Sequence, residues 1–308
     1  MPVKTFMGAG YIELAPWAAR FGLTPAWLKP GKSLRLESAF TKIQVEEDRR
    51  EMTINNLRVF LGEPVVSSRG SLWIGAIDAR ELLGPILRPA GIASPTPKLK
   101  VICVDAGHGG NDTGTQNKSL KLEEKRMTLD VAQRVQRLLQ GQGYRVVMTR
   151  TDDRFIELED RADIANRAKA DLFVSIHFNS FPQESIAGTE TYILTRRTQR
   201  STGATKRETA DSISLPGNAM DPWNAVLGYS MHRQTREKLG TFDRGLKFAR
   251  FKVLTLVNCP GVLFEAGYLS NANEARKISS ADYRSEIAVG IVDGISAYAS
   301  RLDAARKQ

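Results

Sequence analysis

The stretch Lys100–Gly110, KVICVDAGHGG, decides the fold of the longer part of this 308-residue chain. Its apolar run, Val101–Val104, is continuous and soon reaches a glycine. A short continuous apolar run of this kind is typical of a strand that is buried on both faces. Similar strands alternate with amphipathic helices further along the chain. This alternation predicts an α/β fold, a mostly parallel sheet with helices on both faces.

The alternating elements can be placed by their periodicity and by the glycines that end them. The expected strands are YRVVMTR at 144–150, DLFVSIHFN at 171–179 and GVLFEAG at 261–267, and the expected helices span 123–143, 158–170 and 282–302.

A different pattern precedes the quoted stretch. Residues 86–98, ILRPAGIASPTPK, carry three prolines and indicate a linker. Before them, Tyr11–Gly22 and Trp73–Gly84 form a faint repeat, each with an aromatic–Ile start, a short helical pattern and a closing glycine. Four segments between the repeats alternate apolar and polar residues, as strands with one buried face do. We predict a small α+β module at 1–88 with a binding or structural role, a linker at 89–98, and the α/β domain at 99–308.

Composition limits the classes of protein to consider. Hydrophobic residues make up 42% and charged residues 25%, which is ordinary for a globular protein. No run approaches the roughly 20 apolar residues that a transmembrane helix needs. The first residues lack an apolar core behind a basic start, so we expect no signal peptide there.

The charge balance is basic, with 44 Lys and Arg against 34 Asp and Glu. Such a balance favours an acidic partner, such as nucleic acid, anionic lipid or cell-wall polymer, and equally fits a basic surface with no partner. No basic run with interleaved aromatics marks a nucleic-acid platform, so we expect no nucleic acid. Cys103 and Cys259 lie far apart in apolar contexts and are expected to be buried free thiols.

Three predicted strands lead into polar residues that burial does not explain. His108 follows the strand that begins at Val101, His177 lies near the end of the strand at 171–179, and Glu265 lies in the strand at 261–267. Ligands of open α/β sheets bind beyond the carboxyl ends of the strands, so these side chains are expected to converge. Glu124, at the start of the first helix, is a fourth candidate.

Two histidines and a carboxylate are a known ligand set for catalytic zinc, with one position left open for water. A second glutamate beside the metal can serve as the base in amide hydrolysis. Each residue also has a purely structural reading. A histidine after a strand is often a core or turn residue, Glu265 could pair with an arginine, and Glu124 could complement the helix dipole. His232 lies in a helical pattern and is expected to be a surface or packing residue.

The motifs along residues 99–302 resemble the zinc-dependent N-acetylmuramoyl-L-alanine amidases that open with Asp-x-Gly-His-Gly-Gly. Ala106 and Thr113 depart from the resemblance, because the family usually has proline at both places. The module at 1–88 resembles the N-terminal domain named after copper amine oxidases. The motifs that carry the amidase resemblance are VDAGHGG at 104–110, EKRMTL at 124–129, TRTDDRFIELEDRADIANRAKADLFVSIHFNS at 149–180, FDRGLKFARFKVL at 242–254 and CPGVLFEAGYLSN at 259–271.

The resemblance implies roles for individual residues. His108, Glu124 and His177 would bind one zinc ion, and Glu265 would be the catalytic glutamate that acts on water. Glu124 is selected over its neighbour because the family has Glu-Lys at the entry of this helix. Two further residues fall in family-typical positions beside the cleft and are expected to orient the substrate; they are Asn179 and Arg244.

The resemblance also implies the reaction, cleavage of the amide bond between N-acetylmuramic acid and the L-alanine of peptidoglycan. Such an enzyme works in the cell envelope, in the periplasm or outside the cell. A zinc peptidase acting within the stem peptide and a catalytically inactive cell-wall-binding protein are the alternatives, and an activator protein is left open. Some family members place a regulatory helix over the zinc between positions equivalent to 188 and 227. The polar sequence here instead favours a substrate-side loop.

Overall fold

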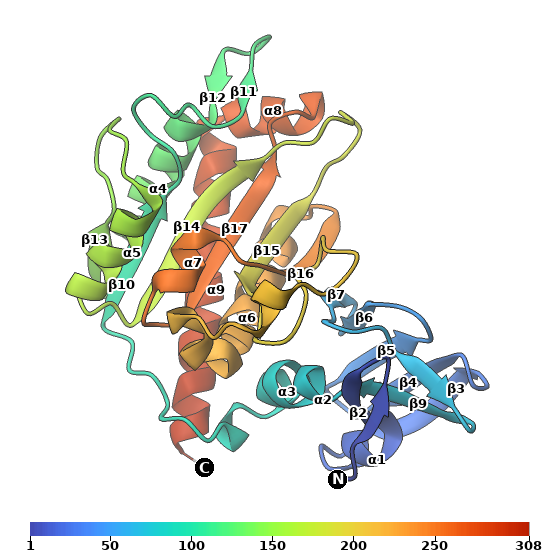
Figure 1. Ribbon diagram of the computed structural model, residues 1–308. Helices are drawn as coiled ribbons and strands as arrows, with labels where there is room; N and C mark the ends of the chain where they lie inside the picture. Colours follow the sequence, from blue (N-terminus) through green and yellow to red (C-terminus); the bar gives the residue numbers. More distant parts are fainter. Residues whose placement is uncertain (308) are drawn as a thin grey trace.

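A computed structural model describes residues 1–307 and is built around one large mixed sheet (Figure 1). The predicted α/β fold is confirmed for the part after residue 100. Across the sheet the strands are β13 (Arg145–Met148), β10 (Val101–Ala106), β14 (Leu172–Asn179), β17 (Gly261–Tyr268), β15 (Thr189–Leu194), β16 (Asp243–Ala249), β7 (Leu57–Phe60), β6 (Glu51–Ile54), β5 (Lys42–Glu46), β4 (Ser33–Glu37) and β3 (Thr24–Lys29).

The strand directions bring several chain segments to one edge of the sheet. Strands β13, β10, β14 and β17 are parallel, as expected for apolar strands covered on both faces. Strand β15 runs antiparallel to β17, and β16 runs parallel to β15. The carboxyl ends of β10, β14 and β17 therefore lie together, beside the start of β15.

Helices cover both faces of this sheet. One face packs apolar side chains such as Val104 and Phe264 against two long helices, which a third helix covers from outside. The other face packs Cys103, Phe173 and Leu263 against shorter helices, so the prediction that the two cysteines are buried free thiols is confirmed. The helices of the first face are α4 (Glu124–Gly141), α6 (Asp221–Leu239) and, outside them, α9 (Ala281–Arg306); those of the second are α5 (Leu158–Arg167) and α7 (Lys252–Leu256); α8 (Ala272–Ser279) follows β17.

The first 88 residues contain the predicted strands and both repeats. Each repeat is a strand followed by a helix, and the two repeat strands pair with each other antiparallel. The four alternating segments form β4 to β7, with apolar residues such as Leu36 and Ile43 fully buried. The repeats are β2 (Ala9–Glu13) with α1 (Leu14–Ala19) and β9 (Ser71–Gly75) with α2 (Ala76–Asp78), and β1 (Lys4–Phe6) and β8 (Val66–Ser68) complete this small sheet.

The module continues the large sheet, because β7 pairs with β16 at Val59 and Leu246. A buried ion pair also joins the two parts, with Arg196 Nη2 2.7 Å from Asp78 Oδ1. After α2 the chain forms a short π-helix, η1 (Ala79–Leu83), a short α-helix, α3 (Gly84–Leu87), and a 3₁₀ turn, η2 (Pro89–Gly91), before an irregular stretch up to β10. The division of the chain at residues 89–98 stays a prediction.

The expectation that 188–227 is a substrate-side loop is wrong. Its first residues form β15 inside the sheet, since the threonines, tyrosine and isoleucine of TETYIL favour a strand. Because β15 is antiparallel to β17, the segment 195–220 leaves the sheet at the edge opposite His177. There it contacts the module, and the Arg50 guanidinium donates to main-chain oxygens at Ser201 and Ala204. The segment contains η3 (Thr209–Ser212) and η4 (Pro216–Met220).

Within residues 1–307, no helix is long and apolar enough to cross a membrane.

Candidate metal centre and active site

Two buried arginines fix the loop that carries His108. This loop follows β10, and His108 has a φ of 62°, a conformation that few non-glycine residues adopt. Arg161 donates to the His108 oxygen at 2.8 Å and to the Ala106 oxygen at 2.7 Å. Arg150 donates to the Gly107 oxygen at 2.8 Å. The positive φ of His108 is therefore held by two arginine side chains that lie far from it in the sequence.

A buried carboxylate balances one of these arginines. Asp105 Oδ1 lies 2.8 Å from Arg161 Nη1, and Asp105 also accepts hydrogen bonds from the hydroxyls of Thr149 and Ser175 at 2.7 Å each. Burial alone would raise the pKa of Asp105, but Arg161 and the two hydroxyls hold it below its usual range. The charge of Arg161 is thus neutralised within the core beneath the loop.

His108, Glu124 and His177 meet at the carboxyl edge of the sheet. One nitrogen from each histidine and one carboxylate oxygen lie within 4.8 Å of one another. His108 Nε2 and His177 Nδ1 are each 3.0 Å from Glu124 Oε1. The main-chain N–H groups of Thr115 and Phe178 donate to the two Glu124 oxygens. This arrangement holds two imidazoles and a carboxylate ready for a shared cation.

The neighbouring glutamate has a different environment. Glu123 points away and forms an ion pair with Arg126 at 2.8 Å. Glu124 is 3% exposed, and although burial would raise its pKa, both histidines hold the pKa well below its usual range. The structure therefore places Glu124, and not Glu123, beside the two histidines.

Asp112 orients the first histidine and was not predicted from the sequence. Its Oδ2 lies 2.8 Å from His108 Nδ1, which leaves His108 Nε2 directed at Glu124. A carboxylate on the far nitrogen is the usual partner of a metal-binding histidine. Burial would lower the pKa of His108, but Glu124 and Asp112 raise it. The signal in the sequence is an acidic residue four positions after the histidine.

Two glycines leave the space that the three side chains fill. A Cβ at Gly107 would lie 2.3 Å from His177 Cε1, so the imidazole requires glycine there. A Cβ at Gly114 would lie 2.6 Å from both Glu124 Oε2 and His108 Cδ2. The glycine of VDAGHGG that precedes the histidine is thus explained by a close approach from the neighbouring strand.

Glu265 lies beside the cluster on the next strand. It is opposite His177 in the register of β14 and β17. Its Oε2 is buried and, among residues 1–307, has no hydrogen-bond partner and no ion pair, so the expected alternative of an arginine partner is not found. Burial, together with the charges of Glu124 and Glu190, raises the pKa of Glu265 well above its usual range.

Glu190, which sequence reasoning missed, organises the other side of Glu265. It lies opposite Glu265 on β15. Its carboxylate accepts from Arg244 Nε at 2.7 Å, from Tyr192 at 2.5 Å and from Tyr268, and Lys247 Nζ lies 3.0 Å away. The signal in the sequence is a glutamate inside the strand-forming segment TETYIL, which opens a long polar stretch.

The two predicted substrate residues lie around Tyr268. Asn179 Nδ2 donates to the Tyr268 hydroxyl at 3.3 Å, and the Arg244 guanidinium stacks 5.4 Å from the centre of the Tyr268 ring. Their expected role in orienting the substrate stays a prediction. His232 is fully buried between Thr191 and Asp243, so it is a packing residue.

Comparison with known proteins identifies the family of the chain. The family model for N-acetylmuramoyl-L-alanine amidase matches residues 102–297. The chain belongs to this family. All four side chains at the carboxyl edge of the sheet lie within the matched range, and the module lies outside it.

Relatives and solved structures agree with this assignment. The amidase is 35% identical over 212 residues to the uncharacterised protein YqiI of Bacillus subtilis, covering 69% of this chain and 91% of the relative. It is 32% identical over 219 residues to the N-acetylmuramoyl-L-alanine amidase AmiC of Escherichia coli, covering 64% of this chain and 52% of AmiC. The catalytic domain of CwlV from Bacillus (Paenibacillus) polymyxa superposes with a TM-score of 0.55 at 34% identity, covering 66% of this chain and 99% of that one. The amidase therefore spans about half the length of AmiC.

Proposed function

We propose that this amidase hydrolyses the bond between N-acetylmuramic acid and the L-alanine of the peptidoglycan stem peptide, and that it uses one zinc ion. The observation that supports this most strongly is the meeting of His108, Glu124 and His177, with donor atoms within 4.8 Å of one another. Two imidazoles and one carboxylate match the ligand set of zinc hydrolases and leave a position open. The carboxylate of Asp112 behind His108 adds the outer partner that such a ligand requires.

A zinc ion in this position would polarise the scissile carbonyl and lower the pKa of water to about 7. The protein's own base would be Glu265, whose Oε2 has no other partner. It accepts a proton from the attacking water and delivers it to the L-alanine nitrogen as the carbon–nitrogen bond breaks. The environment that raises the pKa of Glu265 keeps this carboxyl able to hold a proton between the two steps.

Substrate placement falls to residues next to this base. Asn179 and Arg244 are both anchored to Tyr268, and we assign them the orientation of the muramoyl and peptide groups. The Arg244 side chain is 23% exposed, so its guanidinium can reach a ligand while it holds Glu190. With peptidoglycan as the substrate, the site of action is the cell envelope, in the periplasm or outside the cell, and an activator protein would act there.

The test is a digest of purified peptidoglycan, read by mass spectrometry with and without a zinc chelator. Free stem peptides that begin in L-alanine, lost with chelator and restored by zinc, would support the proposal. Shortened peptides still attached to glycan would identify the zinc peptidase instead. Wall binding with no released product would identify an inactive binding protein, unless an added activator restores cleavage.

A pair of glutamate variants tests the assignment of the base. Glu265→Ala should retain one zinc per chain, measured by elemental analysis, and lose turnover. Glu123→Ala, which removes an ion-paired glutamate outside the cluster, should keep both. Near-normal activity of Glu265→Ala would exclude it as the base.

A further inference from the structure

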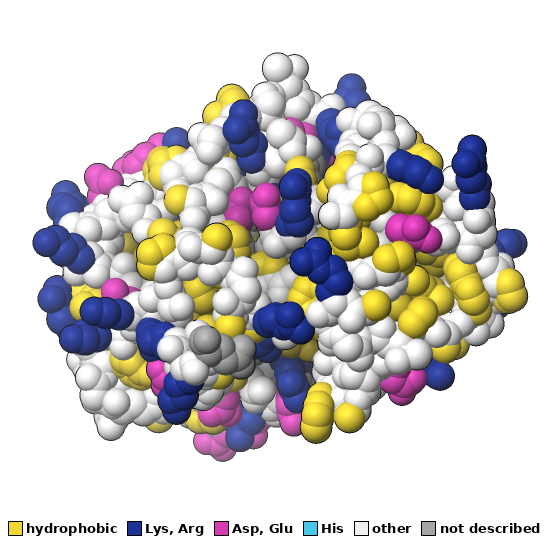
Figure 2. Space-filling model, turned by 90° about the horizontal axis from the view of Figure 1, so that it is seen from below, with side chains coloured by type: hydrophobic (Ala, Val, Ile, Leu, Met, Phe, Trp, Pro, Cys, Tyr) yellow, Lys and Arg dark blue, Asp and Glu magenta, His cyan; other side chains and the backbone are white. Residues whose placement is uncertain are grey.

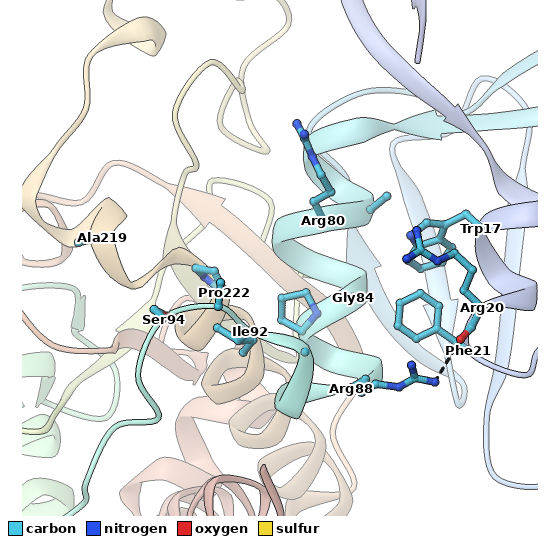
Figure 3. A pocket seen from close by; sticks show the side chains of 14 residues that line it. Trp17, Arg20, Phe21, Arg80, Gly84, Arg88, Ile92, Ser94, Ala219 and Pro222 are labelled. Atoms are coloured by element: carbon cyan, nitrogen blue, oxygen red, sulfur yellow. Dashed lines mark hydrogen bonds between the residues drawn. The ribbon is translucent and has the colours of Figure 1, made fainter. Parts of the chain in front are cut away.

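A groove lies where the module meets the α/β domain. It has a volume of about 570 Å³, within the range of ligand pockets, and its walls come from α1, from η1 and α3, from residues 91–94, and from the region where α6 begins. Figure 3 shows the lining side chains on both sides of the helix formed by η1 and α3, with Gly84 between them. The groove therefore spans the junction between the two parts of the chain.

The centre of the groove is apolar. Trp17 and Phe21 form the wall on the module side, and Ile92 and Pro222 form the wall on the other side (Figure 3). Gly84 lines the groove between these walls and has no side chain to fill it. A ligand can thus contact both walls while it passes over the helix.

Arginines at the ends of the groove are free to bind anions. Arg20, Arg80 and Arg88 are exposed, and within residues 1–307 none of them forms an ion pair with a carboxylate. Arg88 donates to the Arg20 oxygen at 3.1 Å and its guanidinium lies 5.2 Å from the centre of the Phe21 ring, so its position is fixed. No lining residue is acidic. Figure 2, which views the molecule from below, shows further Lys and Arg side chains along the middle of that face.

We propose that this groove binds a short acidic peptide segment of a partner protein, with an apolar side chain between two carboxylates. Figure 3 shows Arg80 and Arg88 near opposite ends of the groove. Arg88 comes eight positions after Arg80, which corresponds to about 12 Å along a helix. An extended peptide spans that distance in about four residues. The carboxylates would pair with the arginines, and the apolar side chain would lie over Gly84.

The separation of the arginines decides between this ligand and other anions. A single phosphate needs donors that converge on one point, whereas these guanidinium groups lie at different ends of a recessed apolar surface. A flat lipid surface would not enter a groove between two walls. The charge and the apolar surface of the groove match a linear peptide motif. Its apolar side chain would supply affinity, and pairing of its carboxylates with the arginines would supply specificity.

The test uses the full chain and two labelled peptides. The probe is fluorescein-Gly-Glu-Leu-Pro-Leu-Glu-Gly, and the matched peptide has glutamine in place of both glutamates. Fluorescence anisotropy should show salt-sensitive binding of the acidic peptide and at least about tenfold weaker binding of the neutral one. The double variant Arg80→Glu, Arg88→Glu should weaken acidic-peptide binding by about tenfold or more.

Control variants separate the groove from general charge. Arg145→Glu, at an exposed position on β13, changes an arginine elsewhere and should leave binding within about twofold of wild type. Ala93→Trp fills the groove at an exposed lining residue without changing any charge, and should also abolish binding. Amidase activity should be unchanged in all of these variants, and that result would show that they are folded.

Three results would overturn the proposal. The first is equal binding of both peptides, and the second is binding that survives the arginine reversal or Ala93→Trp. The third is no peptide binding together with arginine-dependent binding to vesicles of phosphatidylglycerol or to purified peptidoglycan, which would assign the groove to another anionic surface.

Discussion

Glu265 and Glu190 lie directly opposite each other on neighbouring antiparallel strands, and only Glu190 is surrounded by donors. The site thus places a satisfied carboxylate next to an unsatisfied one. Lys247 and Arg244 neutralise Glu190, and burial and both neighbouring carboxylates raise the pKa of Glu265. If Glu265 is the base, as proposed, the charge of Glu190 tunes it.

Two substitutions should move the acid side of the pH–rate profile in opposite directions. Glu190→Gln removes a negative charge beside Glu265, lowers its pKa, and should shift the acid limb of kcat/KM to lower pH. Lys247→Met removes a positive charge and should shift that limb to higher pH. Steady-state kinetics on soluble muramoyl peptides would measure both. Shifts of the acid limb in the same direction would contradict an electrostatic effect of Glu190 and Lys247 on Glu265.

Metal removal should lower stability as well as activity. A ligand that binds only the native state at 100 times its dissociation constant stabilises it by about 2.7 kcal/mol. We therefore expect chelation to lower the melting temperature of the wild-type protein by several degrees, and zinc to restore it. The His177→Ala variant supplies the comparison, because it should melt at the same temperature with and without chelator. A wild-type melting curve that ignores chelator would contradict the metal site.

The sequence predicted the parts of the site that lie at the ends of apolar strands. His108, His177 and Glu265 could be found because each interrupts or follows a run that otherwise forms a buried strand. Glu190 could not, since it lies in the polar first half of TETYIL and its partners come from β16, β17 and its own strand. Pairing between distant strands is set by packing and leaves little trace in local periodicity.

The arginines beneath the site illustrate the same limit. Arg150 and Arg161 lie in the motif at 149–180 without a local sign of their role, and the structure shows that both bind the loop of His108. The pairing of β7 with β16 could not be predicted from local sequence either, because its register contact joins Val59 to Leu246, 187 positions later in the chain. Neither contact follows from composition or hydrophobic pattern.

Loss of Arg161 should destabilise the protein and loosen the metal site together. Arg161→Met leaves Asp105 charged in the core and frees the carbonyls of Ala106 and His108. Removing one partner of a buried pair costs about 3–5 kcal/mol of unfolding free energy, and zinc affinity should fall because His108 loses its fixed backbone. Chemical denaturation and competitive zinc titration would measure the two effects. Arg154→Met, from an exposed pair with Asp152, should change neither by more than about 1 kcal/mol.

Stability should depend on pH through Asp221 at the start of α6. Burial raises the pKa of this carboxyl to about 7, although Asn218 donates to it. The folded state therefore keeps a proton that the unfolded chain releases near pH 4, so the free energy of unfolding falls as pH rises from 4 to 7. Asp221→Asn removes this loss, and urea unfolding should show the variant gaining stability over wild type, from about zero at pH 4 to a few kcal/mol at pH 8. Parallel pH curves for wild type and Asp221→Asn would show that the carboxyl is not held neutral in the fold.

Asp130 supplies a control of the opposite sign. Burial alone would raise the pKa of Asp130, but Arg134 and Arg284 hold it below its usual range. Asp130→Asn should therefore be less stable than wild type at pH 7, and the difference in unfolding free energy should shrink as pH falls.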